Sequence, residues 1–139
     1  MALPRGVRQK NPGNLRYPGA KHFLGCTGGV DGYAVFDTAQ HGIRAMALNL
    51  LGYYREHELD TERGILARWA PGADGNNEAA YLKFVAGRTT WGADEHLKID
   101  SPSVLLALMK AMIAYENSQQ PYTEAVLKEG INEALGAEQ

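Results

Sequence analysis

Glu116 is the residue whose type and position are best suited to chemistry in this chain of 139 residues. Counting back from it by 4, 7 and 11 positions gives Met112, Met109 and Leu105, and residues at these offsets share one face of a helix. A carboxylate at the end of such an apolar stripe is expected to lose part of its hydration and to lie at the negative end of the helix dipole. Because both effects disfavour the charged form, they raise the pKa toward the value that a general acid needs near neutral pH. The pattern alone leaves open a solvated glutamate at a helix end.

The composition argues against several classes of protein. Hydrophobic residues make up 45% of the chain, which is enough for a folded core. The net charge of −2 argues against a nucleic-acid binder, because such proteins usually carry a basic excess. The single cysteine, Cys26, excludes an internal disulfide and a cysteine metal cluster, and the four histidines lack the spacing of a zinc site. We therefore expect no metal and no other cofactor, and no spacing favours a peptidase built on Cys26 with His22 or His41.

No stretch of the sequence approaches the ~20 apolar residues of a membrane-spanning helix. Residues 1–10 lack the apolar core of a signal peptide. We therefore expect a soluble, monomeric protein that is made in the cytoplasm and that depends on another device for delivery if its target lies outside.

The elements that must position Glu116 are mainly helical. We expect an α+β fold of about five helices with a small β-hairpin near the N-terminus, in a single domain over residues 1–139. Within it, residues 1–36 form a loop and β element, residues 37–135 a helical body, and residues 136–139 a tail.

Start signals place the five helices along the chain. The expected starts are Asp37 as an N-cap with Gln40 as its capping-box partner, Asp60 or Thr61, about Asn77, Ser101–Pro102, and Thr123. The fourth helix runs to about Asn117 and carries Glu116. In the front part, residues 24–32 are read as one or two tight turns, and residues 33–36 as a strand paired with the segment around Leu15 and Tyr17.

Four separated segments carry a resemblance to a known family and occur in the family's order. They are Arg5–Arg16, Val35–Ala45, Arg68–Pro71 and Ala114–Asn117. Together they resemble the P5-like virion and lysozyme-like proteins of bacteriophages and prophages, over nearly the whole chain. Asn14–Arg16, Val35–Asp37, the expected helix over residues 38–59 and Tyr81 follow one another in an order that resembles bacterial glucosaminidases and lytic transglycosylases. In this chain the glutamate-bearing helix comes last instead of first, as in a circular permutation.

These resemblances imply a lysozyme-like fold and a peptidoglycan-degrading glycosidase, either a muramidase or a lytic transglycosylase. Glu116 is then the general acid that protonates the glycosidic oxygen between two sugars. The implied partners are peptidoglycan strands and other proteins of the virion or delivery system, and the implied place of action is the cell wall after delivery. The alternative is a non-catalytic virion or peptidoglycan-binding protein that keeps the fold.

Asp31 is the candidate for a second catalytic carboxylate, because it lies in the glycine-rich segment where lysozyme-like folds keep their β-lobe. An ordinary Asp31–Gly32 turn explains the same residues. A hydrolase needs this second acid. A lytic transglycosylase works with one glutamate, because the 6-hydroxyl group of the sugar itself closes on the anomeric carbon.

Five further residues are candidates for substrate binding, each with a structural alternative. Asn11, Asn14 and Arg16 would bind N-acetyl groups or orient Glu116, although turn geometry also explains the asparagines. Tyr81 would line the cleft, or belong to the core. Trp91 is the candidate for stacking on a sugar ring, whereas Trp69 is assigned to the core.

Overall fold

The computed structural model describes residues 3–137. Its elements in chain order are α1 (Arg5–Arg8), β1 (Cys26–Val30), β2 (Tyr33–Phe36), α2 (Ala39–His57), α3 (Glu62–Trp69), a short 3-10 helix (Gly72–Asp74), α4 (Glu78–Arg88), α5 (Pro102–Asn117) and α6 (Glu124–Ala137). The prediction of a mainly helical fold with a small β-hairpin near the N-terminus is confirmed. The helix that the sequence analysis missed is α1, which has only four residues and therefore no periodic pattern.

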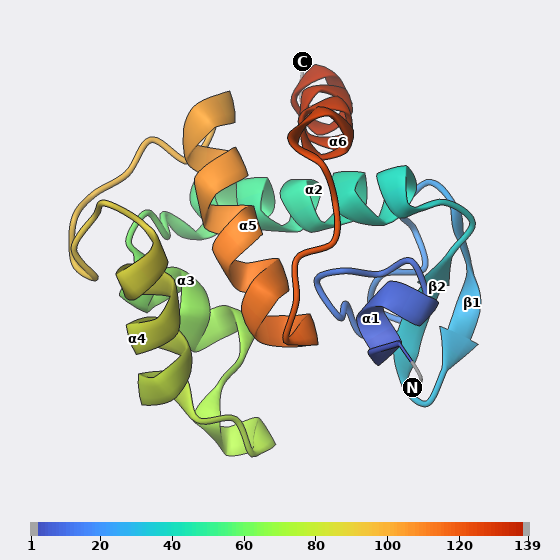
Figure 1. Cartoon of the computed structure of the whole chain (residues 1–139), viewed down its shortest axis with the longest axis horizontal. Coiled ribbons are helices and arrows are strands. Elements are labelled where there is room, and N and C mark those ends of the chain that lie inside the picture. Colours follow the sequence, from blue (N-terminus) through green and yellow to red (C-terminus); the bar gives the residue numbers. More distant parts are fainter. Residues whose placement is uncertain (1–2, 138–139) are drawn as a thin grey trace.

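The long helix α2 runs across the molecule, from the β-hairpin and α1 at one end to α3 and α4 at the other (Figure 1). Helix α6 packs against α2, and α5 packs against both α4 and α6. The main core lies between these helices. It contains Leu105, Met109 and Met112 of α5, all without exposed surface, so the apolar stripe below Glu116 is buried as predicted.

A smaller core lies under the β-hairpin and contains Leu15, Phe36 and Ala45. Trp69 packs against both cores from the end of α3. The two cores are thus joined where the hairpin end of the molecule meets the helical end.

The β-hairpin is closed by a two-residue turn. Asp31 and Gly32 have φ angles of 54° and 84°, and such left-handed pairs match the twist of antiparallel strands. The strand at Tyr33–Phe36 is confirmed, and its partner is β1. The reading of residues 24–32 as turns alone is wrong for β1, because its two glycines conceal the strand pattern.

The expected pairing of β2 with the segment near Leu15 is present as a short addition to the hairpin. Arg16 forms a single β-bridge with Tyr33, and the amide of Ala34 donates to the carbonyl of Leu15 over 2.9 Å. The front of the chain is thereby attached to the sheet.

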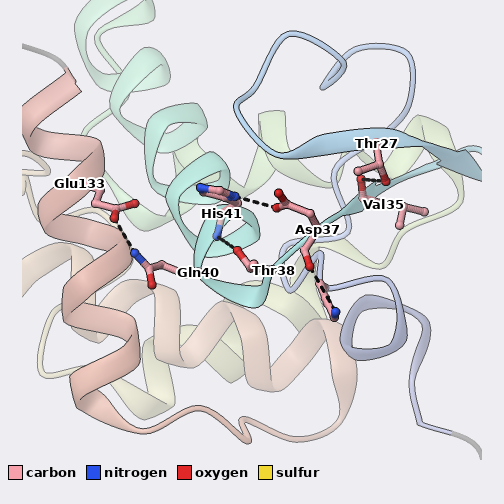
Figure 2. A network of polar contacts seen from close by, with 8 residues as sticks. Thr27, Val35, Asp37, Thr38, Gln40, His41 and Glu133 are labelled. Atoms are coloured by element: carbon pink, nitrogen blue, oxygen red, sulfur yellow. Dashed lines mark hydrogen bonds and ion pairs between the residues drawn. The ribbon is translucent and has the colours of Figure 1, made fainter.

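The sequence signals locate most helix starts closely. Thr61 and Asn77 accept hydrogen bonds from the backbone at the starts of α3 and α4, as expected of N-caps. Helix α2 is capped by Thr38 and not by Asp37, because the Thr38 hydroxyl accepts from the amide of His41 (Figure 2). Oδ1 of Asp37 instead lies 2.6 Å from Nδ1 of His41.

At the other end of the chain, the last helix runs two residues further than predicted, into the expected tail of residues 136–139. Residues 136 and 137 belong to α6, and residues 138 and 139 lie outside the described part of the chain. Gln40 and Glu133 form a hydrogen bond that links the first turn of α2 to α6 (Figure 2). No helix within residues 3–137 combines the length and the apolar character needed to cross a membrane.

Two glycines of α2 provide a matched test of how closely the front of the chain packs on this helix. A Cβ atom at Gly42 would overlap the backbone carbonyl of Lys10, whereas a Cβ atom at Gly52 would meet nothing within 4 Å. We expect Gly42→Ala to lower the free energy of unfolding by about 1–3 kcal/mol, because the neighbouring atoms are backbone and cannot rotate away. We expect Gly52→Ala to raise it by roughly 0.5–1 kcal/mol, because alanine is the better helix former. Urea denaturation of both variants measures the difference, and equal effects would contradict this packing.

Candidate active site

Glu116 lies in the last turn of α5, and two neighbouring side chains hold its carboxyl group. Nδ2 of Asn14 donates to Oε1 over 3.0 Å, and the hydroxyl of Tyr81 donates to Oε2 over 2.8 Å. The Trp69 side chain is a further hydrogen-bond donor to this group. The donors come from the front of the chain, from α4 and from α3, so four separate segments meet at one carboxyl group.

The pKa of Glu116 is raised above its ordinary value of 4.5, and burial is the largest cause. The hydrogen bonds from Asn14, Tyr81 and Trp69 and the positive charge of Arg5 act in the opposite direction, because they stabilise the ionised form. Burial outweighs them. The position of Glu116 at the carbonyl end of α5 also disfavours its negative charge. The group is therefore a carboxylic acid suited to donating a proton at higher pH than an exposed glutamate.

The front loop, defined here as residues 9–16, covers the last turn of α5 and is held there by buried amide groups. Nδ2 of Asn117, the neighbour of Glu116, donates to the carbonyl of Pro12 over 2.9 Å. The Asn11 side chain donates to the carbonyl of Leu15 within the loop and to the carbonyl of Ala34 in β2. It also accepts from the amide of Leu15. These bonds fix the loop so that Asn14 points at Glu116.

An open cleft with a volume of about 510 Å³ gives access to the acid. Its size is within the range of roughly 300–1,000 Å³ that is typical of ligand sites. Its floor and walls combine Glu116 with residues of the front loop, the hairpin and α3. The lining residues most relevant to binding are Arg5, Asn14, Arg16, Tyr33, Asn49, Tyr53, Arg68, Trp69 and Asn76.

The cleft continues into a neighbouring hollow of about 670 Å³. Four residues line both spaces: Phe23, Asn49, Tyr53 and Arg68. The ring of Tyr53 stands edge-on to that of Trp69, with centroids 6.0 Å apart, so the wall shared by the two spaces is aromatic. The two spaces therefore adjoin each other.

Two of the residues predicted to bind substrate line this cleft, namely Asn14 and Arg16. Asn11 does not line the cleft, because it has no exposed surface and its amide group donates to backbone carbonyls. Tyr81 is only 2% exposed and stacks on Tyr115 with ring centroids 3.9 Å apart. It does not line the cleft, and its hydroxyl contacts the site only through the hydrogen bond to Glu116.

Asp31 and Trp91 are not brought to the cleft. Asp31 is exposed in the hairpin turn, and Trp91 is half-buried against the main core. The tryptophan on the cleft wall is Trp69, which the sequence analysis assigned to the core. Arg5 and Arg68 were also missed as lining residues. Both belong to segments that carry the family resemblance, Arg5–Arg16 and Arg68–Pro71, and this membership was the signal that could have identified them.

A second buried carboxyl group, that of Glu62, lies in the first turn of α3 and not on the cleft wall. It accepts a hydrogen bond of 2.6 Å from the hydroxyl of Thr89, and burial raises its pKa. Within residues 3–137, no three His, Cys, Asp or Glu side chains gather in a way that could hold a metal ion.

Fold and site together define a small, mainly helical protein with a partly buried carboxylic acid in an aromatic and cationic cleft. The chain is 34% identical to Protein P5 of Pseudoalteromonas phage PM2 over an alignment of 137 positions, which covers 91% of this chain and 79% of that protein. It belongs to the family of this phage protein. No protein-family model matches the chain.

The hydrogen bond from Tyr81 provides a test of the electrostatics. Because its hydroxyl stabilises the ionised form of Glu116, Tyr81→Phe should raise the pKa of Glu116 further above 4.5. A pH titration of the Glu116 carboxyl carbon by NMR measures the value in both proteins. Tyr122→Phe is the control, since the buried Tyr122 hydroxyl has no hydrogen-bond partner in the described part of the chain. A Glu116 pKa that falls in Tyr81→Phe would contradict the arrangement.

Proposed function

We propose that the protein cleaves the glycan strand of bacterial peptidoglycan, with Glu116 as the general acid. The observation that carries the proposal is a carboxyl group whose burial raises its pKa, held by side-chain donors at the base of an open cleft. A general acid for glycoside cleavage needs such a pKa, because it must be protonated before the reaction and still give up its proton.

The adjoining cleft and hollow support a polymeric substrate. The cleft and the neighbouring hollow share Phe23, Asn49, Tyr53 and Arg68, so a chain of several sugars has a continuous surface to lie on. Aromatic rings such as those of Tyr53 and Trp69 suit the apolar faces of sugar rings. The amide side chain of Asn49 suits an N-acetyl group, which offers one donor and one acceptor.

The arrangement of acids favours a lytic transglycosylase over a hydrolase. Glu116 is the one carboxylate among the lining residues of the cleft whose side chains the structure describes, and Asp31 is not one of them. Without a second carboxylate, the sugar's own 6-hydroxyl group is the nucleophile. Glu116 gives its proton to the leaving oxygen as the glycosidic bond breaks. It then accepts the proton of the 6-hydroxyl as that oxygen bonds to the anomeric carbon, which yields a 1,6-anhydro sugar.

The relative is a phage protein, so the proposed place of action is the host cell wall, reached from the phage particle. In this setting a wall-cleaving domain would open a local passage through the peptidoglycan. Other proteins of the particle are its proposed partners.

Digestion of purified sacculi tests the proposal. We expect Glu116→Gln to lower the rate of muropeptide release by about 10²- to 10⁴-fold, because glutamine keeps the shape of the side chain but cannot donate the proton. Mass analysis of the products should show 1,6-anhydro-muropeptides. Reducing ends would indicate a hydrolase.

Glu62→Gln is the matched control, because it makes the same change at a buried carboxyl group outside the cleft. Its activity should match that of the unmodified protein. Full activity in Glu116→Gln would contradict the proposal. A protein that sediments with sacculi but releases nothing would have a binding role in the particle.

A further inference from the structure

The cleft carries positive charge, although the whole chain has a net charge of −2. Arg5, Arg16 and Arg68 line it, against Glu116 as the one acid among the described lining side chains. Since the pKa of Glu116 is raised, its charge offsets the arginines less than an ordinary glutamate would. A local surplus of cations in a concave site attracts anionic ligands.

Arg5 and Arg16 form a cluster with Tyr33. The guanidinium carbon of Arg5 lies 3.6 Å from the centroid of the Tyr33 ring, and that of Arg16 lies 5.2 Å from it. Tyr33 is part of β2, and the β-bridge from Arg16 and the Gln9 side chain both hold its backbone. Stacking on this fixed ring orients two guanidinium groups beside the cleft.

Neither arginine forms a close ion pair with a carboxylate of the described residues, although the charge of Arg5 does act on Glu116. Within residues 3–137, Nε of Arg5 is buried without a hydrogen-bond partner. By contrast, Arg63 of α3 pairs with Asp94 over 2.7 Å. Two like charges beside one ring repel each other, and an anion placed between them removes this cost.

We propose that the Arg5–Tyr33–Arg16 cluster binds a carboxylate of the substrate and thereby selects peptidoglycan over neutral polymers of N-acetylglucosamine. The inference deepens the proposed function and rests on it for the identity of the glycan. A planar guanidinium group matches a carboxylate with two parallel hydrogen bonds, so a pair of them gives both attraction and orientation. Peptidoglycan offers such a carboxylate from two sources: the lactyl group of peptide-free muramic acid, or the acidic residues of the stem peptide.

The test measures binding in the Glu116→Gln background, which separates recognition from cleavage. Three ligands are compared by calorimetry: a peptide-free tetrasaccharide of alternating N-acetylglucosamine and N-acetylmuramic acid, the same tetrasaccharide with stem peptides, and neutral chitotetraose. Arg5→Gln and Arg16→Gln should each weaken binding of an acidic ligand by about tenfold or more. Binding of chitotetraose should stay within about twofold of its starting value.

Arg88→Gln is the matched control, because Arg88 also stacks on an aromatic ring, that of Phe84 at 4.6 Å, but does not line the cleft. Its affinities should be unchanged. Arg5→Lys keeps the charge without the planar fork and should give an intermediate loss, which guards against a simple folding defect. Arg16 is exposed, so its substitution leaves the core intact.

A loss confined to the peptide-free ligand assigns the lactyl group as the recognised carboxylate, and a loss confined to the peptide-bearing ligand assigns the stem peptide. Equal losses for chitotetraose and the acidic ligands would overturn the inference, as would unchanged affinities or no binding to any ligand. Failure of the proposed function has a different result. The unmodified protein would then release nothing from sacculi, while the charge-dependent binding of acidic oligosaccharides persisted.

Discussion

The front loop, residues 9–16, covers the last turn of α5, and the character of the site depends on this contact. The loop supplies Asn14 as a hydrogen-bond donor to Glu116, whose pKa is raised by burial. The position of the loop is set by hydrogen bonds from the buried side-chain amides of Asn11 and Asn117 and by the close approach of Lys10 to Gly42 on α2. Packing of the loop on α2 thus helps to place the donor Asn14 beside the carboxyl group.

The pKa of Glu116 depends on two opposing effects of its surroundings. Burial raises the pKa, and the donors Asn14, Tyr81 and Trp69 lower it, because they hydrogen-bond to the ionised form. These donors also restrict the direction in which the carboxyl group faces the cleft. Trp69 has a third role, since it packs against both hydrophobic cores. Through Trp69, the site is connected to the packing between the hairpin end and the helical end of the molecule.

The cleft differs in charge from the molecule as a whole. Arg63 pairs with the acidic side chain of Asp94. Arg5 and Arg16 lie beside an aromatic ring instead, with no carboxylate of the described residues within ion-pair distance. Stacking costs them little hydration and fixes their planes, so the arrangement is better prepared for an anion than flexible lysines would be.

The sequence by itself determined the five longer helices and singled out Glu116. The apolar stripe from Leu105 to Glu116, the polar caps and the Ser101–Pro102 start are local signals, and local signals persist in the fold. The tertiary structure alone decided which polar and aromatic groups reach the site. Asn11 and Asn14 are only three positions apart, yet one is buried in backbone bonds and the other faces Glu116. Membership of a cleft wall depends on how distant segments pack, and no local pattern records that.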